Sequence, residues 1–277
     1  MCQIIENMGR KTSMPINVRL KQLIRQALPA KALVIFQALK YGRKKLPAAK
    51  LYVDCFSGAV GIEIGGPSLF FQYVVPLYPV IAKLDGVNFS NQTMWEGSIK
   101  KGEHFKYFKN RVGFQFISEA SDLSQIQTGS YQFLISSNCL EHVANPLKAL
   151  EEWIRVVAPG GYLLLVLPNK SSNFDHRRPI TLFEHLLDDY KNNTSEHDLT
   201  HLNEILVLHD LSRDPAAGEH ENFRKRSLDN FNNRGLHHHV FDLPLIDKIF
   251  SHFGVSLIQS DTTETDYVAL GRVGPAK

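Results

Sequence analysis

The stretch "YQFLISSNCLEHVANPLKALEEWIRVVAPGGYLLLVLPN", residues 131–169, decides the fold of this chain. It begins with an apolar run at 131–137, which predicts a buried strand. Pro146 then opens a helix whose apolar residues at 147, 150, 154 and 157 share one face, and "APGG" at 158–161 ends it. The run "YLLLVLP" at 162–168 is apolar at nearly every position, which is typical of a parallel strand covered on both faces. The stretch therefore predicts a strand–helix–strand unit.

The same alternation extends to both sides of this unit. Strands are predicted at 60–64, 84–90 and 115–123, the last together with its exit loop, and again at 255–260 and 266–273. Asp242 is expected to cap a helix that Gly254 closes. Alternating strands and helices predict an α/β fold with right-handed connections. We expect a Rossmann-like three-layer sandwich with a mostly parallel, seven-stranded sheet.

The composition is that of an ordinary globular protein. Of 277 residues, 43% are hydrophobic and 21% charged, as in average soluble domains. The three cysteines lie far apart in the sequence, which predicts a reducing compartment without a disulfide framework. No apolar run reaches the roughly 18 residues that a membrane span needs. We therefore expect a cytoplasmic protein.

Charge is placed unevenly along the chain. Residues 1–50 carry eleven Lys or Arg and a single acid, Glu6. This asymmetry predicts a basic helical N-terminal arm at 1–50 and a main domain at 51–277. In one interpretation the arm packs on the main domain with its charges solvated. In the other it makes a peripheral contact with an anionic membrane surface.

The loop "EIGGPS" at 63–68 follows the first predicted strand. Sheets of this type bind ligands beyond the carboxyl ends of their strands, where the strand order switches. Gly65 and Gly66 lack side chains, so a ligand can approach the main chain closely. The carboxylate of Glu63 offers a partner for a positive or hydroxyl-bearing group. Two glycines also fit a simple tight turn, so the loop alone leaves both interpretations open.

The order of "EIGGPS", "DGVNFS" and "SEASDL" ahead of residues 131–169 resembles the class I S-adenosylmethionine-dependent methyltransferases. The likeness is to the small-molecule, type 11-like group, which has "LEH" after its fourth strand. It implies methyltransferase activity (EC 2.1.1.-) with S-adenosyl-L-methionine as cofactor. The cofactor-binding residues that the resemblance implies are Glu63, Gly65, Gly66, Pro67, Asp85, Asn88, Glu119, Ala120 and Asn138.

Two of these positions depart from the family's pattern. Asn88 stands where the family usually has an acid that binds the ribose hydroxyls, and Asp85 three residues earlier is the alternative. Pro67 replaces part of the usual glycine motif. The resemblance also implies that Glu119 and Ala120 border the adenine. A non-catalytic binding protein with this fold is the alternative that Asn88 and Pro67 favour.

The acceptor is expected to be a small molecule or a sugar-containing, glycan-type metabolite, methylated at a hydroxyl or an amine. No Asn-Pro-Pro-Tyr follows the fourth strand, so no nucleic acid partner is expected. A long polar insertion at about 170–240 holds nine of the twelve histidines and is expected to form a largely helical lid.

The lid histidines allow three interpretations. They hold the lid together through hydrogen bonds, or one acts as general base, or they bind a metal. His142, His176 and His238 are the candidates for catalysis, with Arg177 or Arg178 holding an anionic substrate. His197 and His201, four residues apart, would share a helix face, as in H-E-x-x-H. Asp198 is shorter than the required Glu, so no metal site is assigned, and a metal-dependent enzyme stays an alternative.

Overall fold

The computed structural model describes residues 46–275. Most of the predicted N-terminal arm, and with it the predicted membrane contact, lies outside these residues. Helix α3 (Ala49–Phe56) runs across position 50, where the sequence places the boundary of the main domain. Within residues 46–275 no helix combines the length and the apolar character that crossing a bilayer requires.

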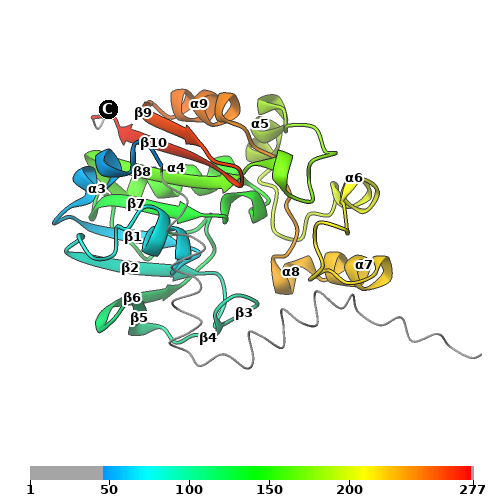
Figure 1. Ribbon diagram of the computed structural model, residues 1–277, viewed down its shortest axis with the longest axis horizontal. Coiled ribbons are helices and arrows are strands. Elements are labelled where there is room, and N and C mark those ends of the chain that lie inside the picture. The colour runs from blue at the N-terminus through cyan, green and yellow to red at the C-terminus, as the bar shows by residue number, and fades with distance from the viewer. Residues whose placement is uncertain (1–45, 276–277) are drawn as a thin grey trace, which may run out of the picture. The chain divides into compact units, whose positions relative to one another are not determined.

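One sheet of eight strands forms the centre of the fold (Figure 1). In spatial order its strands are β5 (Gly102–Phe108), β6 (Arg111–Ile117), β2 (Lys83–Asn88), β1 (Val60–Ile64), β7 (Tyr131–Ser137), β8 (Val157–Pro168), β10 (Asp266–Val273) and β9 (Val255–Thr262). The pairs from β6 to β8 are parallel, and β10 is antiparallel to both of its neighbours. The predicted α/β fold is confirmed. The sheet has one strand more than predicted, because β5 pairs with β6 as an antiparallel hairpin.

Elements with strong local signals lie where the sequence places them. Strands β1, β7 and β10 have the predicted bounds. Helix α4 (Pro146–Val156) begins at the predicted proline, and the side chain of Asn145 accepts a hydrogen bond from Lys148 N at 3.1 Å. Helix α9 (Leu243–His252) is capped by Asp242, which accepts from Leu245 N at 2.9 Å.

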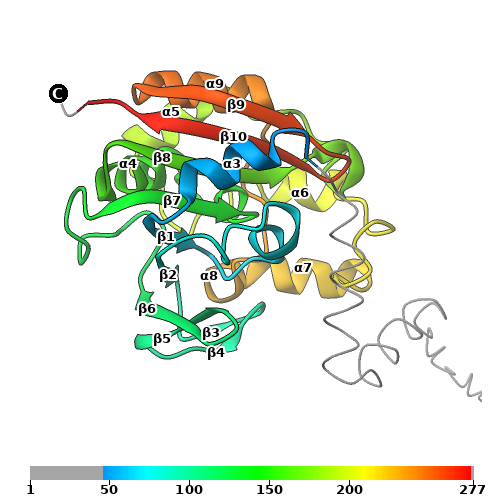
Figure 2. The same ribbon diagram turned by 60° about the vertical axis from the view of Figure 1, so that its left-hand side comes forward.

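The two faces of the sheet are covered by different elements. Helices α4, α5 (Phe183–Lys191) and α9 pack on one face, and Trp153 of α4 is fully buried there. Helix α3 and the π-helical turn η1 (Phe70–Val74) cover the other face, where α3 lies in front of the sheet in Figure 2. Leu163 and Leu165 of β8 belong to the first core and Leu164 to the second. This alternation explains why the strand is apolar throughout.

The predicted His-rich lid connects β8 to α9 and consists of short helices joined by loops, with fewer than half of its residues helical. It contains η3 (Lys170–Ser172), α5, α6 (Leu202–Leu208), α7 (His220–Leu228) and α8 (Asn230–Asn233). Figure 1 shows α6, α7 and α8 beyond one end of the sheet. Thr181 N donates to Val240 O and Val240 N to Thr181 Oγ1, both at 2.9 Å. The segment that contains α5–α8 therefore begins and ends at the same place, where Thr181 and Val240 are hydrogen-bonded.

Candidate functional site

The strand order reverses between β1 and β7, in the middle of the sheet. From β1 the chain continues to β2 on one side, whereas from β7 it continues to β8 on the other. In open α/β sheets this switch point is where a ligand binds, beyond the carboxyl ends of the strands. Gly65 follows β1 and Asn138 follows β7, and both have positive φ angles, +78° and +50°. Two predicted cofactor-binding residues therefore lie at the switch point.

The glycine loop after β1 has no room for side chains. A Cβ atom on Gly65 would lie 2.9 Å from Cys139 Sγ, and one on Gly66 would lie 2.1 Å from Glu63 Cδ. Pro67 follows Gly66 through a cis peptide bond. The loop therefore presents bare main chain beside β7. The packing of Cys139 and Glu63 against this loop therefore requires glycine at both positions.

Glu63 lies beneath this loop and is fully buried. Its carboxylate accepts hydrogen bonds from Tyr78 Oη at 2.8 and 3.0 Å and from Ser68 N at 3.0 Å. Burial raises the pKa of this carboxyl group to about 8, although these hydrogen bonds oppose the rise. In this orientation Glu63 supports the loop from below. The direct contact with the cofactor that the sequence suggested is not favoured by this geometry and stays a prediction.

Asn88 and Asp85 lie at different levels of β2. Asn88 ends the strand, and its Nδ2 donates to Gly66 O at 3.1 Å. Asp85 lies inside the strand, where its carboxylate accepts from Phe114 N at 2.7 Å and from Tyr131 Oη at 2.8 Å. Of the two candidates for binding the ribose, Asn88 is therefore the one beside the glycine loop. Asp85 connects β2 to β6, its neighbour, and to β7 beyond β1.

The loop after β6 carries Glu119 and Ala120. The indole of Trp153 donates to Ala120 O at 2.8 Å and so fixes this loop against α4. Glu119 forms an ion pair with Arg234, which lies in the lid just after α8. The Arg234 guanidinium also lies 4.9 Å from the centroid of the Phe89 ring, just after β2. The lid thus contacts the two loops that the resemblance assigns to the ribose and adenine.

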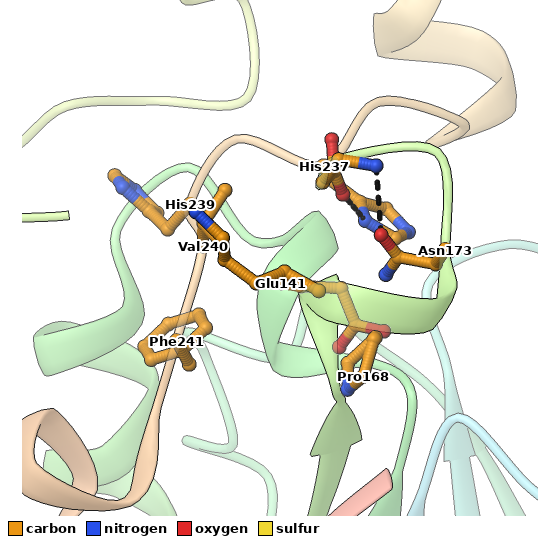
Figure 3. A pocket seen from close by; sticks show the side chains of 9 residues that line it. Glu141, Pro168, Asn173, His237, His239, Val240 and Phe241 are labelled. Atoms are coloured by element: carbon orange, nitrogen blue, oxygen red, sulfur yellow. Dashed lines mark hydrogen bonds and ion pairs between the residues drawn. The ribbon is translucent and has the colours of Figure 1, made fainter. Parts of the chain in front are cut away.

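A small hollow, with room for about one water molecule, borders the carboxyl end of β8 (Figure 3). Its floor includes the turn η2 (Leu140–His142), which follows the Asn138 end of β7. The returning segment at 237–241 closes it from the lid side. The residues that line it are Glu141, Pro168, Lys170, Asn173, Asp175, His237, His239, Val240 and Phe241.

His237 and Asp175 form a buried pair at this hollow. His237 Nδ1 lies 2.5 Å from Asp175 Oδ2, and the other Asp175 oxygen accepts from Arg178 Nη1 at 3.1 Å. Burial alone would raise the pKa of the Asp175 carboxyl, but His237 and Arg178 bring it to about 2. Arg178 also donates to His237 O at 2.8 Å. This arrangement fixes the imidazole ring through Nδ1. Nε2 is the ring nitrogen that Asp175 does not contact.

Glu141 and His142 lie next to this pair. Both Glu141 oxygens are buried, and neither has a hydrogen-bond partner among residues 46–275. Burial raises the pKa of this carboxyl group to about 7. The His142 ring packs edge-on against His237, with centroids 4.6 Å apart, and its Nδ1 lies 2.9 Å from Leu236 O. Unmatched carboxylate oxygens in a hollow are suited to binding hydroxyl groups.

The three predicted catalytic histidines have different surroundings. Of these three, only His142 packs its ring against His237, which lines the hollow. His176 Nε2 lies 2.9 Å from Asp210 Oδ2, and the buried His238 accepts from Asn230 at 3.0 Å. His237 and His239 line the hollow, whereas His238 does not, and a catalytic role for His238 stays a prediction. The three histidines of "HHHV" lie in an extended segment, where successive side chains point to opposite sides.

Two further expectations for the lid are not supported by its contacts. Arg178 is buried and donates to Asp175, to Glu204 at 2.8 Å and to two main-chain carbonyls, so it has a structural role and does not hold a substrate anion. His197 and His201 do not share a helix face, because α6 begins only at Leu202. The His197 ring instead stacks on a phenylalanine ring 3.9 Å away.

Comparison with known proteins agrees with the strand order. A family model described as a methyltransferase domain matches residues 79–260, about two thirds of the chain. No curated protein matches the chain.

Several solved structures are similar to this chain. They include a methyltransferase in complex with the Haloferax volcanii Trm112 activator (11% identity, TM-score 0.48, 92% of this chain and 99% of that chain). A S-adenosylmethionine-dependent methyltransferase from Mesorhizobium loti has 10% identity and a TM-score of 0.47, over 82% and 96% of the two chains. One from Aquifex aeolicus has 12% identity and a TM-score of 0.44, over 85% and 98%. None of the three reaches a TM-score of 0.5, so the fold is assigned from the strand order of this chain.

The family model spans strands β2, β6, β7 and β8, on both sides of the switch point, and the glycine loop at 65–66 precedes the matched residues. The chain belongs to the methyltransferase-domain family and is a class I S-adenosylmethionine-dependent methyltransferase.

Proposed function

We propose that this enzyme methylates a hydroxyl group of a small, sugar-containing metabolite and that His237 is its general base. The observation that carries the proposal is the buried contact between His237 Nδ1 and Asp175 Oδ2 at 2.5 Å, at the edge of a hollow beyond β8. S-adenosylmethionine supplies a methyl group on a sulfonium that needs no further activation. The protein's tasks are therefore to align the acceptor and to remove its proton.

On the donor side, the glycine loop and the ends of β2 and β6 would hold the cofactor. The main chain of Gly65 and Gly66 would lie against it, and Pro67 and Asn138 are the neighbouring candidates for contact. Asn88 offers its Oδ1 to a ribose hydroxyl, since its Nδ2 already binds Gly66 O. A neutral amide gives a weaker hydrogen bond than the carboxylate usual in the family. Glu119 and Ala120 would border the adenine.

On the acceptor side, the His237–Asp175 pair is built as a base. Asp175 binds Nδ1 and so leaves the lone pair on Nε2, as the carboxylate does in a Ser-His-Asp triad. The hydroxyl proton would pass to Nε2 as the oxygen bonds to the methyl carbon, while the bond from that carbon to sulfur breaks and S-adenosylhomocysteine leaves as a neutral thioether. Such assistance typically contributes about 10²–10⁴-fold to the rate. An amine acceptor needs less help, so the pair favours a hydroxyl.

The polar lining of the hollow supports a hydroxyl group as the part of the acceptor that enters it. Glu141 offers two carboxylate oxygens without partners among the described residues, and Asn173 offers an amide. These groups suit hydroxyl groups, which both donate and accept. The basic groups nearby are already engaged, because Arg178 is buried in the lid and Lys170 Nζ donates to Arg178 O. A neutral, hydroxyl-rich group therefore fits better than an anionic one.

The proposal is tested by following S-adenosylhomocysteine formation with a panel of monosaccharides, nucleoside diphosphate sugars and simple amines. With a sugar acceptor, His237→Gln should lower kcat by about 10²–10⁴-fold, with unchanged calorimetric affinity for the methyl donor. His176→Gln is the matched control, because its ring pairs with Asp210 and does not line the hollow. Wild-type kcat in His237→Gln, or turnover with amines alone, would contradict the proposal.

A further inference from the structure

Three histidines and one aspartate from three separate parts of the lid meet away from the His237–Asp175 pair. His185 and Asp189 lie four residues apart on α5 and so share one face of that helix. His201 immediately precedes α6, and His239 belongs to the segment that returns to α9. One nitrogen or oxygen atom from each of the four lies within 4.8 Å of all the others.

The spacing of these atoms is that of ligands around a small cation. His185 Nε2 lies 2.9 Å from His201 Nε2 and 3.2 Å from Asp189 Oδ2. His239 Nε2 lies 3.6 Å from the same Asp189 oxygen. With zinc bonds of about 2.0–2.2 Å, tetrahedral ligand atoms lie about 3.3–3.6 Å apart. Small side-chain movements therefore suffice to place all four around one ion.

A hydrogen-bonded cluster without an ion leaves polar atoms unmatched. His185 and His201 can share one proton, and His239 Nε2 can donate to Ala144 O at 3.2 Å. Asp189 Oδ2 is nevertheless buried without a hydrogen-bond partner among residues 46–275. His185 Nε2 lies 3.2 Å from this oxygen but forms no well-aligned hydrogen bond with it, and a poorly matched buried carboxylate oxygen is costly. A cation among the rings removes that cost.

The carboxylate is also held in position from behind. Asp189 Oδ1 accepts from Thr194 Oγ1 at 3.0 Å, and Asp189 O accepts from Asn145 Nδ2 at 2.9 Å. Outer contacts of this kind orient the ligands of metal sites. The side chain of His185 is 39% exposed, whereas that of His239 is fully buried. An ion can therefore enter along α5 and finish in a protected position.

We propose that His185, Asp189, His201 and His239 bind one Zn²⁺ ion that ties the lid together. Imidazole nitrogens favour zinc over Mg²⁺ and Ca²⁺, which prefer oxygen ligands. Four protein ligands complete a tetrahedral shell, which is typical of a structural rather than a catalytic zinc site. The ion joins α5, the start of α6 and the returning segment. The site does not depend on which acceptor the enzyme methylates.

Metal content and thermal stability of the full-length, tag-free enzyme test this site. We expect about one zinc per chain by mass spectrometric metal analysis. After dialysis against a chelator, added ZnCl₂ should raise Tm by about 3 °C or more, because an ion that binds the folded state stabilises it. MgCl₂ should not raise it. A wild-type enzyme that neither retains zinc nor responds to ZnCl₂ would overturn the proposal.

Two histidines of the same segment provide a matched pair of variants. His201→Ala removes a ligand and should weaken Zn²⁺ affinity at least about 10-fold and abolish the Tm response. His197→Ala removes a ring that stacks on Phe231, outside the cluster, and should keep both properties. If His201→Ala does not fold, His185→Gln at the most exposed ligand replaces it. Equal loss of zinc in His197→Ala and the ligand variant would contradict the assignment.

Discussion

The hydroxyl of Tyr78 lies within hydrogen-bonding distance of both carboxylate oxygens of Glu63, at 2.8 and 3.0 Å. Ser68 N donates to the same carboxylate at 3.0 Å. Both Tyr78 and Glu63 are fully buried, and the carboxylate lies directly under Gly66. The position of the cofactor-binding loop therefore depends on a polar contact inside the core.

Tyr78→Phe tests this dependence. The substitution removes the donor and leaves a buried carboxylate underbonded, which should cost about 1–3 kcal/mol in the free energy of unfolding. Affinity for S-adenosylmethionine should also fall, because the loop loses support. Urea unfolding and calorimetry measure the two effects. Tyr107→Phe is the control, since this neighbouring buried tyrosine makes no hydrogen bond within the described residues.

Glu63 should make stability depend on pH. Burial raises its folded-state pKa to about 8, above its ordinary value of 4.5. Between these two values the folded state binds more protons than the unfolded state, so the free energy of unfolding falls as pH rises. In the wild type the free energy of unfolding should decrease between pH 5 and 8. Glu63→Gln should make this decrease smaller by on the order of 2 kcal/mol. Urea unfolding at both pH values measures this effect. Glu184→Gln, at an exposed residue, is the control and should leave the pH dependence of the free energy of unfolding unchanged. A pH dependence equal to that of wild type in Glu63→Gln would refute the assignment.

A comparison of Gly65→Ala with Gly254→Ala should separate the effect of backbone strain from the loss of cofactor binding at the glycine loop. Gly65 has φ +78° and its Cβ would meet Cys139 Sγ, whereas Gly254 has φ +69° with open space around the same position. Both alanine variants should lose about 1–2 kcal/mol through the left-handed backbone. Only Gly65→Ala should weaken S-adenosylmethionine binding, at least about 10-fold, in calorimetry. Comparable binding in the two variants would show that the cradle lies elsewhere.

Arg234 should control the opening of the lid. Its guanidinium pairs with Glu119 and lies 4.9 Å from each of the Phe89 and Phe231 rings. Arg234→Ala leaves the partly buried Glu196 carboxylate, whose side chain is 12% exposed, without its cation, which should cost up to about 3 kcal/mol. Amide hydrogen exchange across 196–236 should accelerate. Arg213→Ala, which removes an exposed lid arginine, should leave that exchange unchanged.

Much of the sheet could be predicted because its signals are local. Strand β7 and helix α4 have apolar periods and caps that act within a few residues. The hairpin of β5 and β6 was missed, because β5 alternates exposed charged residues with buried ones and carries no helix or turn signal of its own. Its strand pairing depends on contact with β2, which no local pattern records.

The site was less predictable than the fold. The glycine loop was recognised because Gly65 and Gly66 follow a strand directly, and these positions need residues without side chains. The orientation of Glu63 depends on Tyr78, fifteen residues later, and was not foreseeable. In "HHHV" the sequence showed three adjacent imidazoles, but only the fold brings Asp175 to the first of them.

The meeting of Thr181 and Val240 has a consequence for how such enzymes diversify. Since the excursion through α5–α8 departs and comes back at one hydrogen-bonded junction, the strands that carry the cofactor loops do not need to shift when it is replaced. A different segment grafted between Thr181 and Val240 would keep the strands proposed to bind the methyl donor. It would change the lid, which is proposed to bind the acceptor. The junction thus separates the segment that carries His237 from the strands of the central sheet, so the two can vary independently.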